Sequence, residues 1–395
     1  MINIMDEKDC CGCGACSEIC PKGCISMELG TLGHMFPVVE QNNCIGCGKC
    51  EKVCPMLMPL DTSERKPQVA YAAYAKDKKA RFKGSSGGIF GVLASELLLH
   101  GYIIYGAAFD NDMKLKCARA ENIEELQPLM KSKYLQSDLT RKYSEIKENL
   151  DNNKKVLFVS TPCQVTALKK YLGKHYENLI TLDFFCHGVP SQKFFDECKQ
   201  YIESKRNIKI VDFQFRSKRK NGSTPHYYSM KYMYKGKTYI EQKLYFKSAF
   251  YAAFQKYINL RESCYECRFA GKNRNADITI GDFHEIDNYV EGINRFDGIS
   301  TVIINSYLGS HLWDLCKNKL NIIEVNLDQL EKDRVCFAGG TKRPTNRDEF
   351  IDDYKTKSFD FLVNKYMNPR SYWKWEIYYL LPKTIREKIK KCMGA

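Results

Sequence analysis

The chain has 395 residues, of which 44% are apolar and 27% charged, so it is long enough for two or three globular domains. Its 19 cysteines do not indicate a disulfide scaffold, because such scaffolds are short secreted chains, and neither a signal peptide nor a membrane-spanning apolar run is recognisable. We therefore expect a cytoplasmic, metal-holding protein from an anaerobic host. Residues 1–60 carry a net charge of −3 and the whole chain +14, which leaves +17 for the remainder. This favours an acidic redox partner such as a ferredoxin or flavodoxin, and no nucleic-acid motif accompanies the charge.

A cysteine pattern occurs twice near the N-terminus. The spacing C-x2-C-x2-C-x3-C-P, found at 10–21 and 44–55, is typical of two-cluster ferredoxins, in which the fourth cysteine of each copy binds the other cluster. We predict two [4Fe–4S] clusters in a ferredoxin-like domain of residues 1–60, with a zinc site or a disulfide knot as the alternatives. The predicted ligands are Cys10, Cys13, Cys16 and Cys54 for one cluster, and Cys44, Cys47, Cys50 and Cys20 for the other. Cys11 and Cys24 lie off the pattern and are expected to pack beside the clusters.

The chain after this domain predicts an α/β body. Residues 61–68 form a polar linker, and the Gly-Ser turn at 84–88 leads into an apolar helix. Strands alternate with helices from residue 156 onward, which predicts βαβ units and parallel strands. Residues 210–246 alternate with period two, which predicts an antiparallel hairpin. Further elements are expected as a helix at 89–99, strands at 102–109, 156–160, 179–185, 277–283 and 298–306, and a helix at 309–320.

The predicted fold class is α+β. It consists of the ferredoxin-like domain, a body with a mixed sheet in two parts (69–155 and 156–325), and a helical C-terminal extension (326–395) with an aromatic, basic end. For that end, packing of its aromatic side chains on the body is the simpler expectation, and peripheral docking on a membrane or partner is the alternative.

Four further cysteines indicate a third site. Cys163 and Cys186 each follow a predicted parallel strand, in the turn before a helix, and ligands of open α/β sheets bind at that edge. If the two strands are neighbours, the two thiols converge. Cys264 and Cys267 form a separate C-x-x-C. A site of four thiolates would take zinc or [4Fe–4S], and four unrelated buried cysteines are the remaining alternative.

A series of motifs resembles a known family. In chain order they are SSGG (85–88), KSKYLQS (131–137), TPCQ (161–164), CHGVPS (186–191), YECRFAGKNRNADITIGDF (265–283) and GISTVIINS (298–306). Together with the ferredoxin repeat they are similar to the beta-subunit family of coenzyme F420-reducing hydrogenase and F420-linked formate dehydrogenase, over most of the chain to about residue 310. The resemblance implies a third [4Fe–4S] cluster at the four-thiolate site, and an FAD beside it.

The resemblance also implies residues for the flavin site. The Ser-Gly turn offers hydroxyls and backbone amides at a helix N-terminus, where a pyrophosphate could bind. The implied flavin-binding residues are Ser85, Ser86, Gly87, Gly88, Lys131, Ser132, Lys133, Tyr134, Thr161, Gln164 and Asp282. His187, next to a predicted ligand, is a candidate proton donor or hydrogen-bonding neighbour of the cluster.

These expectations lead to an iron–sulfur flavoprotein oxidoreductase. Electrons from a ferredoxin-type donor would pass through the clusters to FAD and on to an organic substrate, which by analogy with some relatives is sugar-linked. The reverse direction is equally compatible with the sequence. The alternatives are an electron-transfer subunit of a larger hydrogenase or dehydrogenase complex, an F420-dependent oxidoreductase, and a simple polyferredoxin carrier. A homo-oligomer is also left open.

Overall fold

The computed structural model describes residues 2–3, 6–58, 69–218, 227–283, 286, 289, 298–328, 330, 337, 339–368, 377–378, 381 and 385. The predicted linker at 61–68 and most of the aromatic C-terminal end lie outside these residues. Contacts divide the chain into two compact units. Unit 1 comprises residues 1–192 and 260–342, and unit 2 comprises residues 193–259 and 343–395. In the described part of the chain, we find no helix with the length and apolar character needed to cross a membrane.

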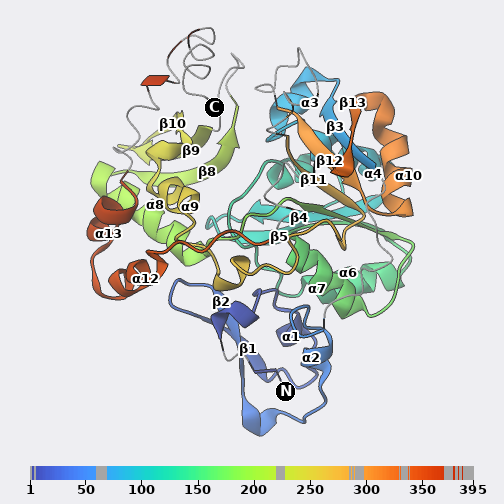
Figure 1. Ribbon diagram of the computed structural model, residues 1–395, viewed down its shortest axis with the longest axis horizontal. Coiled ribbons are helices and arrows are strands. Elements are labelled where there is room, and N and C mark those ends of the chain that lie inside the picture. The colour runs from blue at the N-terminus through green and yellow to red at the C-terminus, as the bar shows by residue number, and fades with distance from the viewer. Residues whose placement is uncertain are drawn as a thin grey trace. The chain divides into compact units, whose positions relative to one another are not determined.

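Unit 1 contains a mixed sheet of eight strands in the order β13-β3-β12-β11-β7-β6-β4-β5 (Figure 1). The strands β4, β6, β7 and β11 are parallel to their neighbours in this series, and the outer strands pair antiparallel. The mixed sheet of the prediction is therefore confirmed. The strand bounds are β3 Val69–Ala75, β4 Tyr102–Phe109, β5 Leu115–Ala120, β6 Lys155–Val159, β7 Leu179–Phe184, β11 Ile278–Asp282, β12 Ser300–Ile304 and β13 Leu320–Val325.

Helices cover both faces of this sheet because each helix has apolar side chains to bury. Helices α4, α5 and α10 share one apolar core with the sheet, and α6 and α7 share another on its second face. Helix α3 precedes α4 on the chain. The helix bounds are α3 Lys78–Lys83, α4 Ile89–Leu99, α5 Ile123–Leu126, α6 Lys142–Asp151, α7 Pro162–Leu172 and α10 Tyr307–Cys316. The predicted helix at 89–99 and strand at 102–109 are observed with the same bounds.

The N-terminal part of unit 1 is a small β-hairpin with two short helices. Strands β1 (Ile25–Leu29) and β2 (Met35–Val39) pair antiparallel, and helices α1 (Ala15–Glu18) and α2 (Lys49–Lys52) lie within the two cysteine repeats. Ala15 and Val53 pack into the apolar core beneath α6 and α7. The ferredoxin-like region is thus packed on the body within one compact unit.

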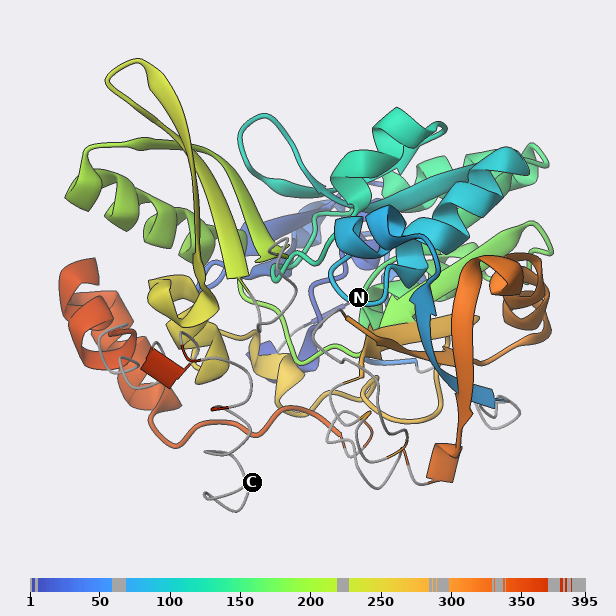
Figure 2. The same ribbon diagram turned by 90° about the horizontal axis from the view of Figure 1, so that it is seen from above.

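Unit 2 combines an antiparallel three-stranded sheet with helices (Figure 2). The period-two segment predicted at 210–246 forms this sheet, and its final hairpin turns at Lys235 and Gly236, both with positive φ. The predicted helical extension includes α12 and α13. The element bounds are α8 Gln192–Arg206, β8 Lys209–Ser217, β9 Tyr227–Tyr234, β10 Lys237–Leu244, α9 Ala249–Gln255, α12 Arg347–Thr356 and α13 Phe359–Tyr366.

Candidate functional site

Three pockets in unit 1 are each surrounded by four of the predicted cysteines, and we call them site 1, site 2 and site 3. Their empty volumes, open solvent included, are about 310, 360 and 520 Å³, respectively. The structure therefore brings together all three sets that the sequence predicts. The cysteines are Cys10, Cys13, Cys16 and Cys54 at site 1, Cys20, Cys44, Cys47 and Cys50 at site 2, and Cys163, Cys186, Cys264 and Cys267 at site 3.

Sites 1 and 2 are built by equivalent turns of the two repeats. Gly12 and Gly14 have φ of +66° and +78°, and Gly46 and Gly48 have +67° and +71°. Only glycine adopts these values at little cost, so each repeat can turn tightly around its pocket. Backbone amides are also directed at sulfur, because the amide of Gly12 donates to Cys10 Sγ at 3.3 Å. Such donors lower the negative charge that each thiolate would carry.

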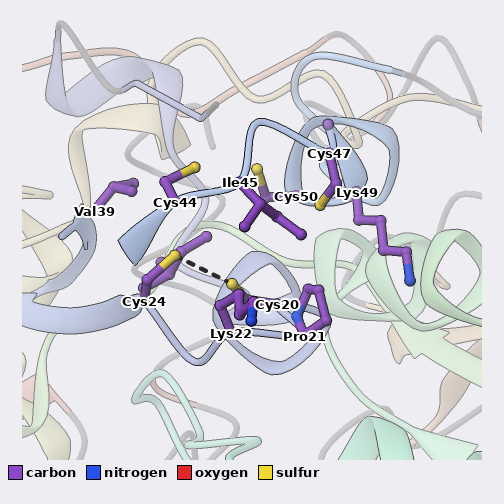
Figure 3. A pocket seen from close by; sticks show the side chains of 12 residues that line it. Cys20, Pro21, Lys22, Cys24, Val39, Cys44, Ile45, Cys47, Lys49 and Cys50 are labelled. Atoms are coloured by element: carbon purple, nitrogen blue, oxygen red, sulfur yellow. Dashed lines mark hydrogen bonds between the residues drawn. The ribbon is translucent and has the colours of Figure 1, made fainter. Parts of the chain in front are cut away.

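Site 2 is the most open of the three at its cysteines. Cys47 is exposed, and Lys22 and Lys49 line the same pocket (Figure 3). Cys24, which lies off the repeat, has its Sγ 3.4 Å from Cys20 Sγ. Its hydrogen bond to Cys20 raises the pKa of Cys24 to about 11. The expectation that Cys24 packs beside this cysteine set is confirmed.

Site 3 forms where two parallel strands end beside each other. Strands β6 and β7 are parallel neighbours, so Cys163 in the first turn of α7 and Cys186 after β7 come to one edge of the sheet. The convergence expected from the βαβ pattern is confirmed. The C-x-x-C loop reaches the same edge through a bridge between Pro190 and Leu260.

Two glycines allow the loops of site 3 to approach one another closely. A Cβ on Gly188, whose φ is +108°, would lie 2.7 Å from Leu260 and 3.0 Å from the Cβ of Cys264. A Cβ on Gly340 would lie 2.5 Å from the carbonyl oxygen of Tyr265. Thr341 then donates from its amide to the Cys264 carbonyl, at 3.3 Å, and from its hydroxyl to the His187 carbonyl, at 2.7 Å. The segment 340–341 therefore closes over the C-x-x-C loop.

The thiols of site 3 differ in their ionisation. Burial raises the pKa of Cys186 and raises that of Cys264 to about 12. A hydrogen bond from Cys11 is the main cause that lowers the pKa of Cys163 to about 7. Cys11 lines both site 1 and site 3, so this off-pattern cysteine packs between two predicted cluster sites. Thiols with a raised pKa lose their proton and act as ligands only when a metal supplies positive charge.

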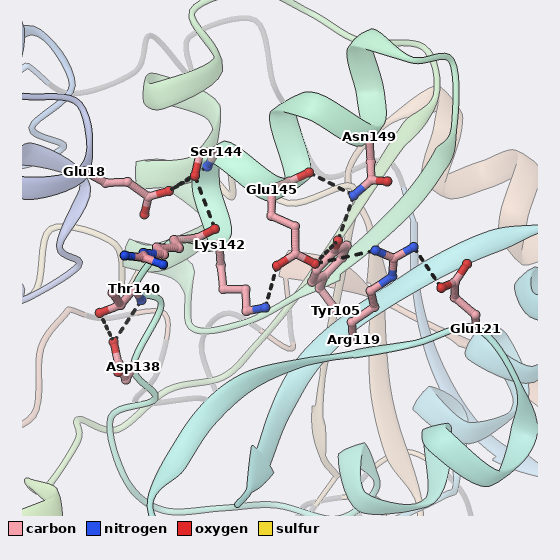
Figure 4. A network of polar contacts seen from close by, with 11 residues as sticks. Glu18, Tyr105, Arg119, Glu121, Asp138, Thr140, Lys142, Ser144, Glu145 and Asn149 are labelled. Carbon is pink, nitrogen blue, oxygen red and sulfur yellow. Dashed lines mark hydrogen bonds and ion pairs between the residues drawn. The ribbon is translucent and has the colours of Figure 1, made fainter. Parts of the chain in front are cut away.

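The ferredoxin-like region is held to the body by polar contacts. Glu18 Oε1 accepts from the amide and the hydroxyl of Ser144, each at 2.6 Å (Figure 4). The Tyr143 hydroxyl donates to the Cys13 carbonyl at 2.8 Å, and the ring of His34 is 3.0 Å from the Val189 carbonyl. These contacts fix sites 1 and 3 relative to each other inside unit 1.

Arg261 makes the most extensive of these contacts. It is 1% exposed, and it donates to the carbonyls of Cys10, at 2.8 Å, and of Met35, and to Gln136 Oε1 at 3.1 Å. Its guanidinium also lies 4.5 Å from the centroid of the Phe36 ring. The same cation lines site 3 and helps to lower the pKa of Cys163. Arg261 thus combines an anchoring role with positive charge near two cysteine sites.

The residues expected at the flavin come together in part. The amide of Ser132 donates to Ser85 Oγ at 2.7 Å, so the two loops 85–88 and 131–134 lie side by side. The amide of Gly87 donates to Ser300 Oγ at 3.0 Å, and Ser300 is the register partner of Asp282. Gly88, with φ of +83°, caps α4. These three segments therefore converge at one place in unit 1.

Other predicted flavin residues are occupied within the protein. Lys133 donates to the carbonyls of Pro128 and Met130 at 2.6 and 2.7 Å, and desolvation lowers its pKa to about 7. Gln164 is 1% exposed and donates to the Ser137 carbonyl at 2.9 Å. Its Oε1 accepts from the hydroxyls of Ser137, Ser160 and Thr161 at 3.3, 2.5 and 3.2 Å. Their roles at a flavin stay predictions.

The remaining predicted residues are near site 3 or at the loop convergence. Thr161 lines site 3, with its hydroxyl 3.2 Å from Cys163 Sγ. His187 is exposed beside Cys186. Ser86 donates from its hydroxyl to the Ile299 carbonyl at 2.7 Å, and Lys131 has a positive φ of +67°. Tyr134 is half-buried.

Models of known protein families match two parts of the chain. The family model for the C terminus of the coenzyme F420 hydrogenase/dehydrogenase beta subunit matches residues 153–329, and that for a 4Fe-4S binding domain matches residues 36–59. Residues 153–329 are therefore similar to the C-terminal domain of this beta-subunit family. No curated protein matches the chain. A chain in a solved structure of the F420-reducing [NiFe] hydrogenase complex from Methanosarcina barkeri is 18% identical, with a TM-score of 0.43, over 77% of this chain and 96% of that one.

All four cysteines of site 3 fall inside the beta-subunit domain, and four cysteines of sites 1 and 2 fall inside the 4Fe-4S domain. The protein is therefore related to the beta subunits of hydrogenases and dehydrogenases and carries an iron–sulfur domain at its N-terminus. Sequence reasoning missed Arg261, Arg274 and Gly340 near site 3. A glycine pair before Thr341 was a weak signal, but single arginines in polar loops gave none.

Proposed function

We propose that this chain is an electron-transfer subunit of the F420 hydrogenase/dehydrogenase type, with [4Fe–4S] clusters at sites 1, 2 and 3. The observation that carries the proposal is the arrangement of twelve cysteines as three sets of four, each around its own pocket, within one compact unit. The sites are also joined in series. Ile2 lines site 1 and donates its amide to Cys50 Sγ of site 2 at 3.3 Å, and Met56 lines both site 1 and site 3.

The donor chemistry suits iron–sulfur clusters. None of the residues that line the three pockets is a histidine, aspartate or glutamate, so thiolate is the available ligand. A zinc ion would need its sulfurs about 2.3 Å from a single point. Among the described residues, no group of three or more Cys, His, Asp or Glu side chains is gathered tightly enough for one ion. Four cysteines around each pocket, with no other ligand type among the lining residues, instead suit a cubane.

The chain's own residues prepare these pockets for a negatively charged group. Bound clusters would supply one-electron transfer, which the amino acids themselves cannot. Backbone amides donate to the sulfurs of Cys10 and Cys50, and Arg261 places a buried cation beside sites 1 and 3. Met56 and Phe269 are apolar lining residues that reduce the access of water to site 3.

We also propose that the converging loops 85–88 and 131–134, together with Asp282, bind FAD. A bound FAD would exchange single electrons with the clusters and a hydride with an organic substrate. The loop convergence and the helix N-terminus at Gly88 support this proposal, because backbone amides there suit a pyrophosphate. The substrate, whether sugar-linked or F420 itself, follows from analogy alone, and His187 remains the candidate proton donor.

A second reading is a self-contained reductase that works without partner subunits. It is favoured by the chain's own 4Fe-4S domain, which gives a soluble ferredoxin or flavodoxin a place to deliver electrons. The beta-subunit match favours the subunit reading instead. Exposed Cys47, with Lys22 and Lys49 beside it, is where we propose that an acidic partner meets site 2 in either case.

The proposals are tested together by anaerobic purification from the native host. Iron, sulfide, flavin and co-purifying chains are quantified per protein chain. Twelve irons and one FAD are expected, with hydrogenase or dehydrogenase subunits present if the subunit reading holds. Eight irons would refute the cluster at site 3, absence of flavin would refute the FAD site, and an active single chain would favour the self-contained reductase.

A further inference from the structure

Arg274 is a buried cation beside site 3. Its side chain is 1% exposed, and its Nε, Nη1 and Nη2 make no hydrogen bond to any described residue. It follows the C-x-x-C loop and lines site 3 together with all four cysteines. A guanidinium has five N–H donors, and burying it without partners is costly. The position therefore calls for an anion inside the pocket that Arg274 lines.

The nearest carboxylate does not meet this need. Asp183, on β7, is 0% exposed, and its Oδ2 is 3.9 Å from Arg274 Nη1, which is too long for a hydrogen bond. Its Oδ1 instead accepts from the Thr279 hydroxyl at 2.5 Å, while Oδ2 has no hydrogen-bond partner among the described residues. The ring of Phe185, centred 5.3 Å from the guanidinium, covers another side of Arg274. Arg274 and Asp183 are thus too far apart for a hydrogen bond, and the N–H groups of Arg274 make none to the described residues.

The other buried charges nearby are already satisfied. Asp277 accepts from the amide and hydroxyl of Thr181, at 2.7 and 2.5 Å, and from the Ser306 hydroxyl at 2.7 Å. Lys169 Nζ donates to the Asn275 carbonyl and lies 3.8 Å from Asp277. Among the described charged side chains around site 3, Arg274 is therefore the one whose N–H groups make no hydrogen bond. Arg261, the other cation that lines the pocket, donates hydrogen bonds to the Cys10 and Met35 carbonyls and to Gln136 Oε1.

We propose that Arg274 directs its free N–H groups at the group bound in site 3 and, with Asp183 as fixed counter-charge, sets the reduction potential of that group. The inference rests on the proposed function, because it takes the group to be a [4Fe–4S] cluster held by four thiolates. One-electron reduction makes such a cluster more negative by one charge. A nearby cation favours the reduced form, and a nearby carboxylate disfavours it. The two side chains therefore act on the potential in opposite directions.

The test is a redox titration of the full-length, anaerobically purified protein, followed by electron paramagnetic resonance. We expect Arg274→Gln to lower the potential of site 3, so that the ratio of reduced to oxidised cluster at a fixed applied potential falls about tenfold, which is about 59 mV for one electron. Asp183→Asn removes the opposing charge and should raise the potential. Arg274→Lys keeps the charge and should shift it less than Arg274→Gln. The control is Arg119→Gln, because Arg119, on the edge strand β5, pairs with Glu121 and Glu145 and lines none of the three sites.

Opposite shifts in the two variants would not arise from a merely structural role. Shifts in the same direction, or an unchanged potential in both variants at twelve irons per chain, would overturn the inference. If Arg274→Gln loses the cluster at site 3 and retains eight irons, the test rests on Asp183→Asn. A potential of site 3 that does not rise in Asp183→Asn then refutes the proposal. Eight irons in the unmodified protein would instead refute the proposed cluster at site 3.

Discussion

Replacing Arg261 with methionine should loosen the ferredoxin-like region from the rest of unit 1. The substitution keeps an unbranched side chain of similar length but removes the donors to the Cys10 and Met35 carbonyls and to Gln136. Hydrogen bonds from a charged group contribute roughly 1.5–3 kcal/mol each, and a buried acceptor left without a donor costs about 1–3 kcal/mol. Partial replacement by water reduces the sum, so we expect a net loss of about 3 kcal/mol against local opening.

Amide hydrogen exchange measures this opening directly. At about 1.4 kcal/mol per factor of ten, the loss corresponds to roughly 100-fold faster exchange of the protected amides between residues 10 and 36. Arg268→Met is the matched control, because Arg268 donates one hydrogen bond, at 2.8 Å, to the Met56 carbonyl. It should accelerate exchange by about tenfold or less. Equal acceleration in the two variants, or exchange within threefold of the unmodified protein in Arg261→Met, would refute the anchoring role.

Three further outcomes are expected. Cys186→Ala should lose about four of twelve irons. Cys198→Ala, which changes a buried cysteine of unit 2, should lose none. A similar loss in both variants would contradict the assignment of site 3. Cys24→Ser should retain all twelve irons despite its contact with Cys20, and a loss of four would make Cys24 a ligand. Burial raises the pKa of Asp183 to about 6, so the folded protein holds a proton that the unfolded chain has released, and stability should fall by roughly 1–2 kcal/mol from pH 5 to pH 7. The urea midpoint of unfolding, measured between pH 5 and pH 7, would show this fall in stability. An equal fall in Asp183→Asn would show that Asp183 is not its cause.

The sequence predicted the parts of the site that depend on local spacing. Each cysteine repeat spans about ten residues and has glycines at equivalent positions, and the ferredoxin pattern predicted that the fourth cysteine of each repeat joins the other set. Cys163 and Cys186 required one more inference, that β6 and β7 are parallel neighbours, and the pairing confirms it. A strand-helix-strand pattern restricts topology strongly enough for that step.

The parts that the sequence did not predict depend on distant contacts. Strand β3 pairs antiparallel with β12 and β13, more than 200 residues further along the chain, and no local pattern encodes such a partner. Unit 2 is assembled from two separated segments for the same reason. Arg261 and Arg274 lie in polar loops where a solvated side chain is the ordinary expectation, and only the tertiary structure buries them.

The placement of these arginines bears on the direction of electron flow. Burial alone would lower the potential of site 3, because a low dielectric disfavours the extra negative charge of a reduced cluster. At site 2 this penalty would be smaller, because Cys47 is exposed. Unopposed, this difference would hold electrons at the outer site and obstruct transfer to a flavin. Two buried guanidinium groups line site 3, whereas the cations that line site 2 are lysines. With clusters bound, the arginines would act against the burial penalty, and we expect their removal to slow inward transfer more than the loss of either lysine.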